Sequence, residues 1–292
     1  MNETEEIFLE YKDQPASDTK ATRLDLFGDA KRGFVRIRKD FVQRESAPRP
    51  SVLSELVVGR KERALDLLLT VHALSPILEG TPLPIATWAR LLHSDERPCT
   101  DRAIHSSLRV LSQMNLLSVK GAKTQPEIIL YRENGDETPW IKDPKAQSKS
   151  DLGRGFFTIP FDYWTEGIID RLRMPGKAML LILLKETQDP NGPKTFTMPV
   201  ERASSWYGIS ERTAERGYRE LANQKIIAQH LQKVPDSRHP AGRREIYHRA
   251  LLHPYSTAHR EMLRAMAYEA SNRDTTTSVQ KAKDVLRVAA DL

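Results

Sequence analysis

One pattern occurs twice in this chain of 292 residues. Arg32-Gly33-Phe34 starts a short apolar stretch in the first copy, and Arg154-Gly155-Phe156 starts the matching stretch in the second. In both copies a leucine-rich segment follows, then a proline, a tryptophan (Trp88, Trp206) and a basic segment with helical periodicity. A repeat of about a hundred residues is too long for a solenoid unit, so the pattern predicts two copies of a small domain.

Shifts in composition divide the chain around these copies. Residues 1–30 are acidic and weakly periodic, which predicts a mostly disordered tail with at most a short helix. Turn-forming and charged residues separate the copies, and helical spacing returns near the end of the sequence. We therefore predict an acidic tail (1–30), a first domain (31–132), a linker (133–152), a second domain that folds alone (153–256) and C-terminal helices (257–292).

The net charge of +6 is unevenly distributed. Eight acidic and three basic residues give residues 1–30 a charge of −5, which leaves +11 on the remainder. A basic body with an acidic tail favours a polyanionic partner, most often nucleic acid. A basic protein without such a partner fits the charge equally well.

Cysteine and histidine usage argues against a metal site. The single cysteine, Cys99, excludes an intramolecular disulfide framework and a cysteine-rich zinc site. The eight histidines lack the spacings of common metal motifs, so we expect no metal and no other cofactor. No apolar run reaches membrane-spanning length and no signal peptide is evident, which predicts a cytoplasmic, nucleoid-associated protein without a membrane partner.

The second copy contains the sequence of a helix-turn-helix. Lys177–Leu184 is apolar on nearly every side, as expected for a central core helix. Pro199 opens the next helix, and Gly208-Ile209-Ser210 forms a turn in which glycine ends one helix and serine caps the following one. The first copy lacks this glycine, because its turn reads Arg97-Pro98-Cys99-Thr100.

The helix after each turn presents a polar stripe. In the second copy Ala214, Tyr218 and Leu221 form the inward stripe. The outward stripes contain only hydrogen-bond donors and small polar groups, and they are Arg212, Arg216, Arg219 and Asn223 in the second copy and Arg102, Ser106, Arg109 and Gln113 in the first. Arginine matches guanine edges and phosphate oxygens, and a helix fits the major groove, which favours DNA reading. The alternative is a solvated helix whose arginines pair with the neighbouring acids, Glu211, Glu215 and Glu220.

A predicted hairpin follows each of these helices. In the second copy, strands over 226–232 and 245–250 flank a polar, proline-containing loop. Basic residues in and beside this loop suit contacts with the DNA backbone or minor groove, and they are Lys233, Arg238, Arg243 and Arg244. Strand, helix, helix-turn-helix and hairpin together make a winged helix, so we predict a mainly α fold with small β wings.

Both copies resemble winged helix-turn-helix DNA-binding domains. The second is similar to the replication initiators and regulators of bacterial plasmids and integrated elements, and to actinobacterial helix-turn-helix proteins. The resemblance rests on the strand from Phe156 to Pro160, the core helix from Pro175 to Leu181, the turn Asp189-Pro190-Asn191-Gly192, and the run from Tyr207 to Gly217. It implies two tandem winged domains in which Ser210 caps the reading helix and Arg212, Thr213 and Arg216 read bases.

These features predict a sequence-specific double-stranded DNA-binding protein, not an enzyme. A bacterial transcriptional regulator is the first interpretation, and a replication initiator or partition factor of a mobile element is the alternative, with host transcription or replication proteins as further partners. A nuclease or recombinase would need paired carboxylates or histidines on a metal, or a nucleophilic tyrosine surrounded by Arg and His. His248-Arg249 with His253-Pro254-Tyr255 is the one cluster of that last kind. A protein-interaction winged helix would need apolar outward stripes. The apolar face of Val279–Leu292 further predicts a homodimer.

Overall fold

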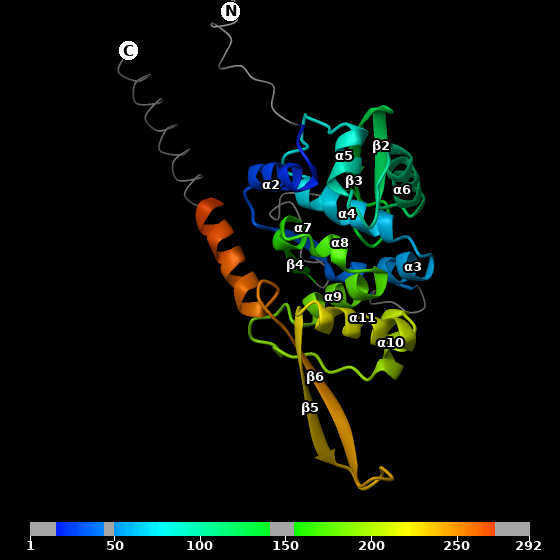
Figure 1. Ribbon diagram of the computed structural model, residues 1–292, viewed down its shortest axis with the longest axis vertical. Coiled ribbons are helices and arrows are strands. Elements are labelled where there is room, and N and C mark those ends of the chain that lie inside the picture. The colour runs from blue at the N-terminus through cyan, green and yellow to red at the C-terminus, as the bar shows by residue number, and fades with distance from the viewer. Residues whose placement is uncertain (1–15, 44–49, 141–154, 272–292) are drawn as a thin grey trace, which may run out of the picture.

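Helices and three two-stranded antiparallel sheets make up the described part of the protein (Figure 1). The computed structural model describes residues 16–43, 50–140 and 155–271. The prediction of a helical fold with small β elements is confirmed at this level. Figure 1 shows one hairpin at the upper end of the long axis and a longer hairpin projecting from the lower end.

The two halves of the chain repeat one order of elements: a strand, a core helix, a helix, a turn, a second helix and a hairpin. The first half consists of α2 (Thr19–Asp29), β1 (Phe34–Arg38), η1 (Lys39–Phe41), α3 (Val52–Val58), α4 (Glu62–Leu74), α5 (Ile85–Leu91), α6 (Asp101–Gln113), β2 (Leu117–Ala122) and β3 (Gln125–Leu130). The second consists of β4 (Phe156–Pro160), α7 (Asp162–Thr165), α8 (Ile168–Arg171), α9 (Met174–Glu186), η3 (Val200–Arg202), α10 (Ala203–Tyr207), α11 (Glu211–Asn223), β5 (Ile227–Pro235), β6 (Arg243–Leu251) and a C-terminal helix (257–271).

The core helices α4 and α9 are buried along nearly their whole lengths. This explains why 177–184 is apolar on every side, and the prediction of a central core helix there is confirmed. One continuous hydrophobic core contains residues from both helices. The two halves are therefore not separate bodies joined only by a linker, and the linker beyond Trp140 lies in 141–154, outside the described residues.

The first strands of the two copies pair with each other. β1 and β4 are antiparallel with Arg36 opposite Thr158, and these residues hold the same position in their copies. Two backbone hydrogen bonds of 2.9 Å extend the pair at its two ends: Lys39 N to Gly155 O, and Phe161 N to Gly33 O. Because equivalent atoms exchange equivalent bonds, the two copies are related by a pseudo-two-fold axis through this sheet.

Each half also places a turn against a short helix of the other half. The Ser54 hydroxyl in α3 donates a hydrogen bond of 2.8 Å to Gly208 O, in the turn before α11. Arg97, in the turn before α6, donates a hydrogen bond of 2.6 Å to Ile169 O in α8. These reciprocal contacts extend the pseudo-two-fold relation from the strands to the helices.

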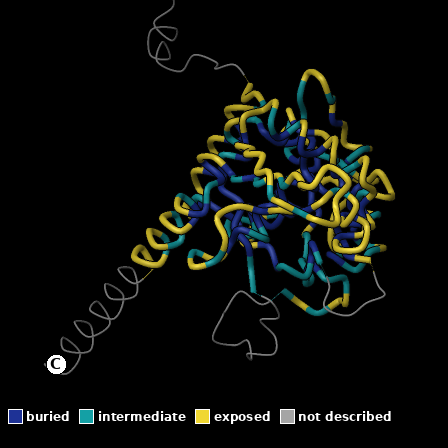
Figure 2. Tube along the Cα trace, turned by 90° about the horizontal axis from the view of Figure 1, so that it is seen from below, coloured by how far each residue is buried: buried dark blue, intermediate teal, exposed yellow. Residues whose placement is uncertain are grey.

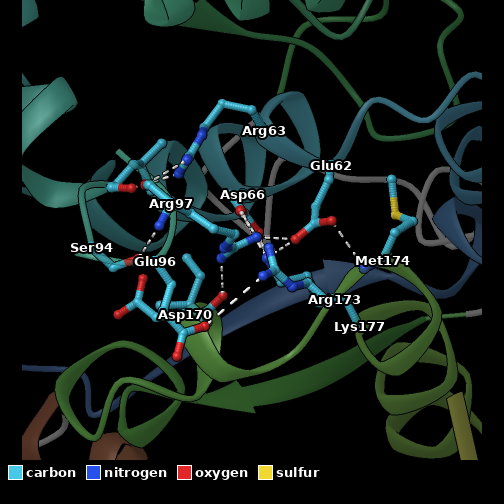
Figure 3. A network of polar contacts seen from close by, with 12 residues as sticks. Glu62, Arg63, Asp66, Ser94, Glu96, Arg97, Asp170, Arg173, Met174 and Lys177 are labelled. Atoms are coloured by element: carbon cyan, nitrogen blue, oxygen red, sulfur yellow. Dashed lines mark hydrogen bonds and ion pairs between the residues drawn. The ribbon is translucent and has the colours of Figure 1, made fainter. Parts of the chain in front are cut away.

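A buried network of charged groups joins α4 to α9 (Figure 3). Lys177 Nζ lies 2.6 and 2.8 Å from the oxygens of Asp66 and 3.0 Å from Glu62 Oε1, and the side chains of Lys177 and Asp66 have no exposed surface. Glu62 also pairs with Arg97, and its other oxygen accepts from Met174 N at 3.1 Å. Because breaking a buried ion pair costs about 3–5 kcal/mol, this network holds the halves in one arrangement.

The acidic N-terminal segment is part of the fold from α2 onward. Asp18 caps α2 by accepting from Ala21 N at 2.7 Å. Phe27 is buried and stacks on Trp164 in the second half, with ring centroids 5.0 Å apart. The buried Arg23 forms an ion pair with Asp170. Residues 19–29 form the short helix that the prediction allows, and this helix docks on both halves, while residues 1–15 lie outside the described residues.

The predicted C-terminal helices are described only in part. Arg260 has no exposed surface and anchors the helix 257–271 to the end of α9 by donating to Leu184 O at 2.9 Å and Thr187 O at 2.8 Å. Figure 2 shows exposed residues along the outer part of this helix. The segment Val279–Leu292, on which the homodimer prediction depends, lies outside the described residues.

Candidate nucleic-acid interface

The turn before α11 requires a glycine for two reasons. Gly208 has a φ of +66°, which favours glycine, and a Cβ there would lie 2.5 Å from Ser54 Oγ. Ile209 is buried in the core, and the Ser210 hydroxyl accepts from Thr213 N at 3.2 Å, which caps α11. The predicted roles of these turn residues are confirmed.

The inner side of α11 packs tightly on α9. Ala214, Tyr218 and Leu221 are buried, so the predicted inward stripe is confirmed. Gly217 is buried as well, and a Cβ at this position would lie 2.4 Å from both Pro175 O and Met179 Cγ. This close helix packing fixes the orientation of the opposite side of α11.

The opposite side of α11 is the candidate reading surface, and we call it the α11 basic face. Its members Arg212, Arg216, Arg219 and Asn223 are all exposed, and the neighbouring Thr213 is half-buried. Arg219 lies 3.1 Å from Glu215, an exposed pair of the kind that contributes little to stability. Among the described residues, no ion pair reaches Arg212 or Arg216.

Glu220 does not pair with the α11 basic face. Its Oε2 accepts from Arg173 N and Gly176 N, both at 3.1 Å, and so caps the start of α9. The alternative interpretation was that the arginines of α11 pair with acids of the same helix. Among the described residues, Arg219 is the one α11 arginine that forms such an ion pair.

The corresponding surface of the first half is the α6 polar face. Its members are all exposed, and they are Arg102, Ser106, Arg109 and Gln113. Thr100 caps α6 by accepting from Ala103 N at 3.3 Å. The turn is formed without glycine because Arg63 holds it, donating to Arg97 O at 3.0 Å. The α6 and α11 faces lie on different halves, at equivalent positions of the repeat.

The hairpin β5–β6 projects from the body beside α11 (Figure 1). The four basic residues predicted on it, Lys233, Arg238, Arg243 and Arg244, are all exposed. Asp236 closes the tip, since its N donates to Gly242 O at 3.0 Å and its Oδ1 accepts from Arg238 N at 3.0 Å.

Arg249 connects the hairpin to α11. Its guanidinium lies over the ring of Tyr218, 3.6 Å from the ring centroid. Its backbone also forms two hydrogen bonds with Phe196, at 2.8 and 3.1 Å. Burial lowers the pKa of Arg249. The sequence did not predict this role, because the ring on which Arg249 stacks belongs to a helix distant along the chain.

A hollow of about 820 Å³ lies between α11 and the hairpin. Arg219, Arg244 and Arg249 line it, and Arg249 Nη1 is buried without a hydrogen-bond partner in the described part of the chain. Glu201, Glu215 and Glu245 also line it. The structure thus brings the predicted residues Arg219 and Arg244 to one surface, where three guanidinium groups are matched by three carboxylates.

The tyrosine of the predicted His-Arg-Tyr cluster is buried. Tyr255 is 1% exposed, and burial raises the pKa of its hydroxyl far above the usual value. Within residues 16–43, 50–140 and 155–271, no three His, Cys, Asp or Glu side chains gather as a metal site would require. None of the described helices is both long and apolar enough to span a bilayer.

Comparison of the chain with models of protein families, with curated proteins and with solved structures gives no match.

Proposed function

We propose that this protein binds double-stranded DNA sequence-specifically and that its two halves are tandem winged helix-turn-helix domains. The observation that carries the proposal is the α11 basic face: Arg212 and Arg216 are exposed and have no ion-pair partner among the described residues. Their helix is fixed from behind by its close packing on α9. A rigid helix that presents unpaired arginine forks is suited to bidentate contacts with guanine edges in the major groove.

The neighbouring surfaces support the same function. The tip of the β5–β6 hairpin offers the exposed Arg238 and Arg243 to the DNA backbone. The pseudo-two-fold axis relates α11 to α6, as the two subunits of a DNA-binding dimer are related. We infer that one chain reads two half-sites, in the role of a transcriptional regulator or, as the alternative, of a replication initiator or partition factor.

Alanine substitutions on α11 test this proposal. Arg212→Ala and Arg216→Ala should each weaken binding to a duplex enriched from a random pool by roughly 1–3 kcal/mol, because each removes a bidentate base contact. Lys20→Ala is the matched control, since it removes one exposed positive charge from α2. Fluorescence anisotropy measures the affinities. Unchanged affinity of the double variant, with its circular dichroism spectrum intact, would contradict the proposal.

A further inference from the structure

The C-terminal helix (257–271) crosses the start of β1 and brings arginines of the two elements together. A Cβ on Gly33 would lie 3.4 Å from Leu263 Cδ2, so the helix touches the chain at this point. Arg32 and Arg264 are the direct neighbours of these two contact residues. Arg32 is exposed and Arg264 is half-buried.

A third arginine, Arg36, completes this group. Val35 and Ile37 are buried in the core, so Arg36 between them points to the opposite side of β1, and it is exposed. Burial lowers the pKa of Arg36, and the charges of Arg32 and Arg264 lower it further. The three guanidinium groups are therefore close enough to repel one another, and we call them the β1 arginine cluster.

No carboxylate of the described residues neutralises the β1 arginine cluster. The side chains of Arg32 and Arg36 form no hydrogen bond or ion pair within this part of the chain, and Arg264 Nε donates only to Arg260 O, at 3.4 Å. No acidic group is among those that shift the pKa of Arg36. Like charges held together are unfavourable, and a negatively charged partner would relieve their repulsion.

The next arginine along the same strand shows which partner this side of β1 accepts. Arg38 lies two residues beyond Arg36 and therefore on the same side of the strand. The carboxylate of Glu133 accepts from Arg38 N at 3.2 Å and lies 3.5 Å from Arg38 Nε. A carboxylate is thus the group that this protein itself places beside an arginine of β1.

DNA on the proposed reading faces is poorly placed to supply the negative charge. α4 contacts both β1 and α6, and α9 contacts both β4 and α11, so the core helices lie between the sheet and the reading helices. Figure 1 shows the C-terminal helix, in orange, and α6 at opposite sides of the molecule. A duplex bound along α6 would lie far from Arg264.

The chain carries the complementary charge in residues 1–15. This segment contains one lysine and five acids, which are Glu3, Glu5, Glu6, Glu10 and Asp13. It precedes α2, which ends at Asp29, just before Arg32, and whose 11 residues span about 16 Å. Fifteen extended residues span about 50 Å, so the segment is long enough to return along α2 to the cluster.

We infer that the β1 arginine cluster binds residues 1–15 of its own chain through pairs of carboxylate and guanidinium groups. Exposed pairs of this kind are individually weak and are screened by salt, so the segment should dissociate at high ionic strength. This inference does not depend on DNA binding, and it gives the acidic N-terminal segment a partner within the molecule.

Paramagnetic broadening in the full chain measures this contact. A nitroxide is attached at residue 4 (Thr4→Cys), with the buried Cys99 changed to Ser. The amide signals of Gly33 and Leu263 should lose most of their intensity, while those of Arg212 and Arg216 on the α11 basic face keep theirs. Salt at about 1 M, where the screening length is about 3 Å, should restore the lost signals. Broadening confined to the α11 basic face, or broadening of neither surface, would overturn the inference.

Two charge variants locate the contact. The double variant Arg36→Glu, Arg264→Glu should remove the broadening of Gly33 and Leu263. The matched double variant Arg212→Glu, Arg216→Glu should leave it in place, and circular dichroism checks that both are folded. The triple variant Glu5→Gln, Glu6→Gln, Glu10→Gln tests the same pairs from the acidic side and should also remove the broadening. Broadening that persists in the triple variant would contradict the assignment.

A mixing experiment separates the chain's own segment from that of a second copy. An isotope-labelled chain without nitroxide is mixed with an unlabelled chain that carries it. The signals of Gly33 and Leu263 in the labelled chain should stay unchanged. If they broadened as much as in the singly labelled protein, a second copy would supply the segment and the inference would be wrong.

Discussion

Among single residues, Glu133 shows most directly how burial changes chemistry in this fold. It lies in the segment predicted as a linker, yet it is fully buried, and its Oε1 accepts from Arg38 N at 3.2 Å. Burial raises the pKa of Glu133 to about 7, although the Arg38 guanidinium partly opposes this shift. Burial and Arg38 together lower the pKa of the neighbouring His72 to about 3.

These pKa shifts predict how stability depends on pH. The ordinary pKa of a glutamate is 4.5, and that of Glu133 in the folded chain is about 7. At a pH between these two values, Glu133 is protonated in the folded chain and deprotonated in the unfolded chain. The contribution of Glu133 to stability therefore falls as pH rises through this window. Glu133→Gln removes this dependence, so the unfolding free energy of the variant relative to the natural protein should rise by up to about 3 kcal/mol from pH 4.5 to 7.

Urea unfolding at several pH values measures this difference. His72, whose Nδ1 lies 4.0 Å from Glu133 Oε1, contributes an opposite slope between about pH 3 and its ordinary pKa of 6.5, so both proteins carry His72→Gln in this comparison, which removes that slope. A constant difference between the two proteins across this range would contradict the prediction.

At the scale of elements, the packing of α11 on α9 holds the proposed reading surface in place. Gly217→Ala would place a Cβ 2.4 Å from the Pro175 carbonyl oxygen, which is backbone and cannot turn aside. The variant should lose roughly 1–3 kcal/mol of unfolding free energy and weaken DNA binding, because α11 must shift outward. Gly28→Ala in α2 is the control: its Cβ meets nothing within 4 Å, so it should be neutral or stabilising. Calorimetry measures both, and equal stabilities would contradict this account of the packing.

Local sequence patterns predicted these elements well. Helical periodicity placed the buried and exposed sides of α11, and the Gly208-Ile209-Ser210 turn followed from its residue types. The patterns failed where a residue's partner is distant in sequence. In the sequence, three charged residues look like ordinary surface charges. The fold reveals that Arg249 stacks on a tyrosine ring, Glu220 caps the start of α9, and Arg63 holds the turn before α6.

At the scale of the whole molecule, the two copies form a pseudo-symmetric unit within one chain. The repeat was evident in the sequence, but the pairing of β1 with β4 was not, because nothing in a short strand specifies a partner so far along the chain. The buried contacts of Lys177 with Asp66 were hidden for the same reason.

This arrangement changes the expectation that the second domain folds alone. A fragment of residues 153–256 would expose β4 along one edge and leave Lys177 without its carboxylate partners. We now expect this fragment to be unfolded or aggregated, and to recover structure when mixed with residues 1–140. Circular dichroism and sedimentation of the separate and mixed fragments show whether the 153–256 fragment folds alone or only with the first half. If the 153–256 fragment melted cooperatively on its own, the shared core would not be required for the second half to fold, which would contradict this prediction.

The most direct test of the central claim is the pattern of the DNA sequences that the full chain selects from random duplexes. Because a pseudo-two-fold axis relates α6 to α11, we predict two half-sites in inverted orientation that differ in sequence, as their reading residues do. The Arg212→Ala, Arg216→Ala double variant should lose the preference at one half-site and keep it at the other. Selection of no sequence, or of one that is unchanged by the double variant, would contradict the claim.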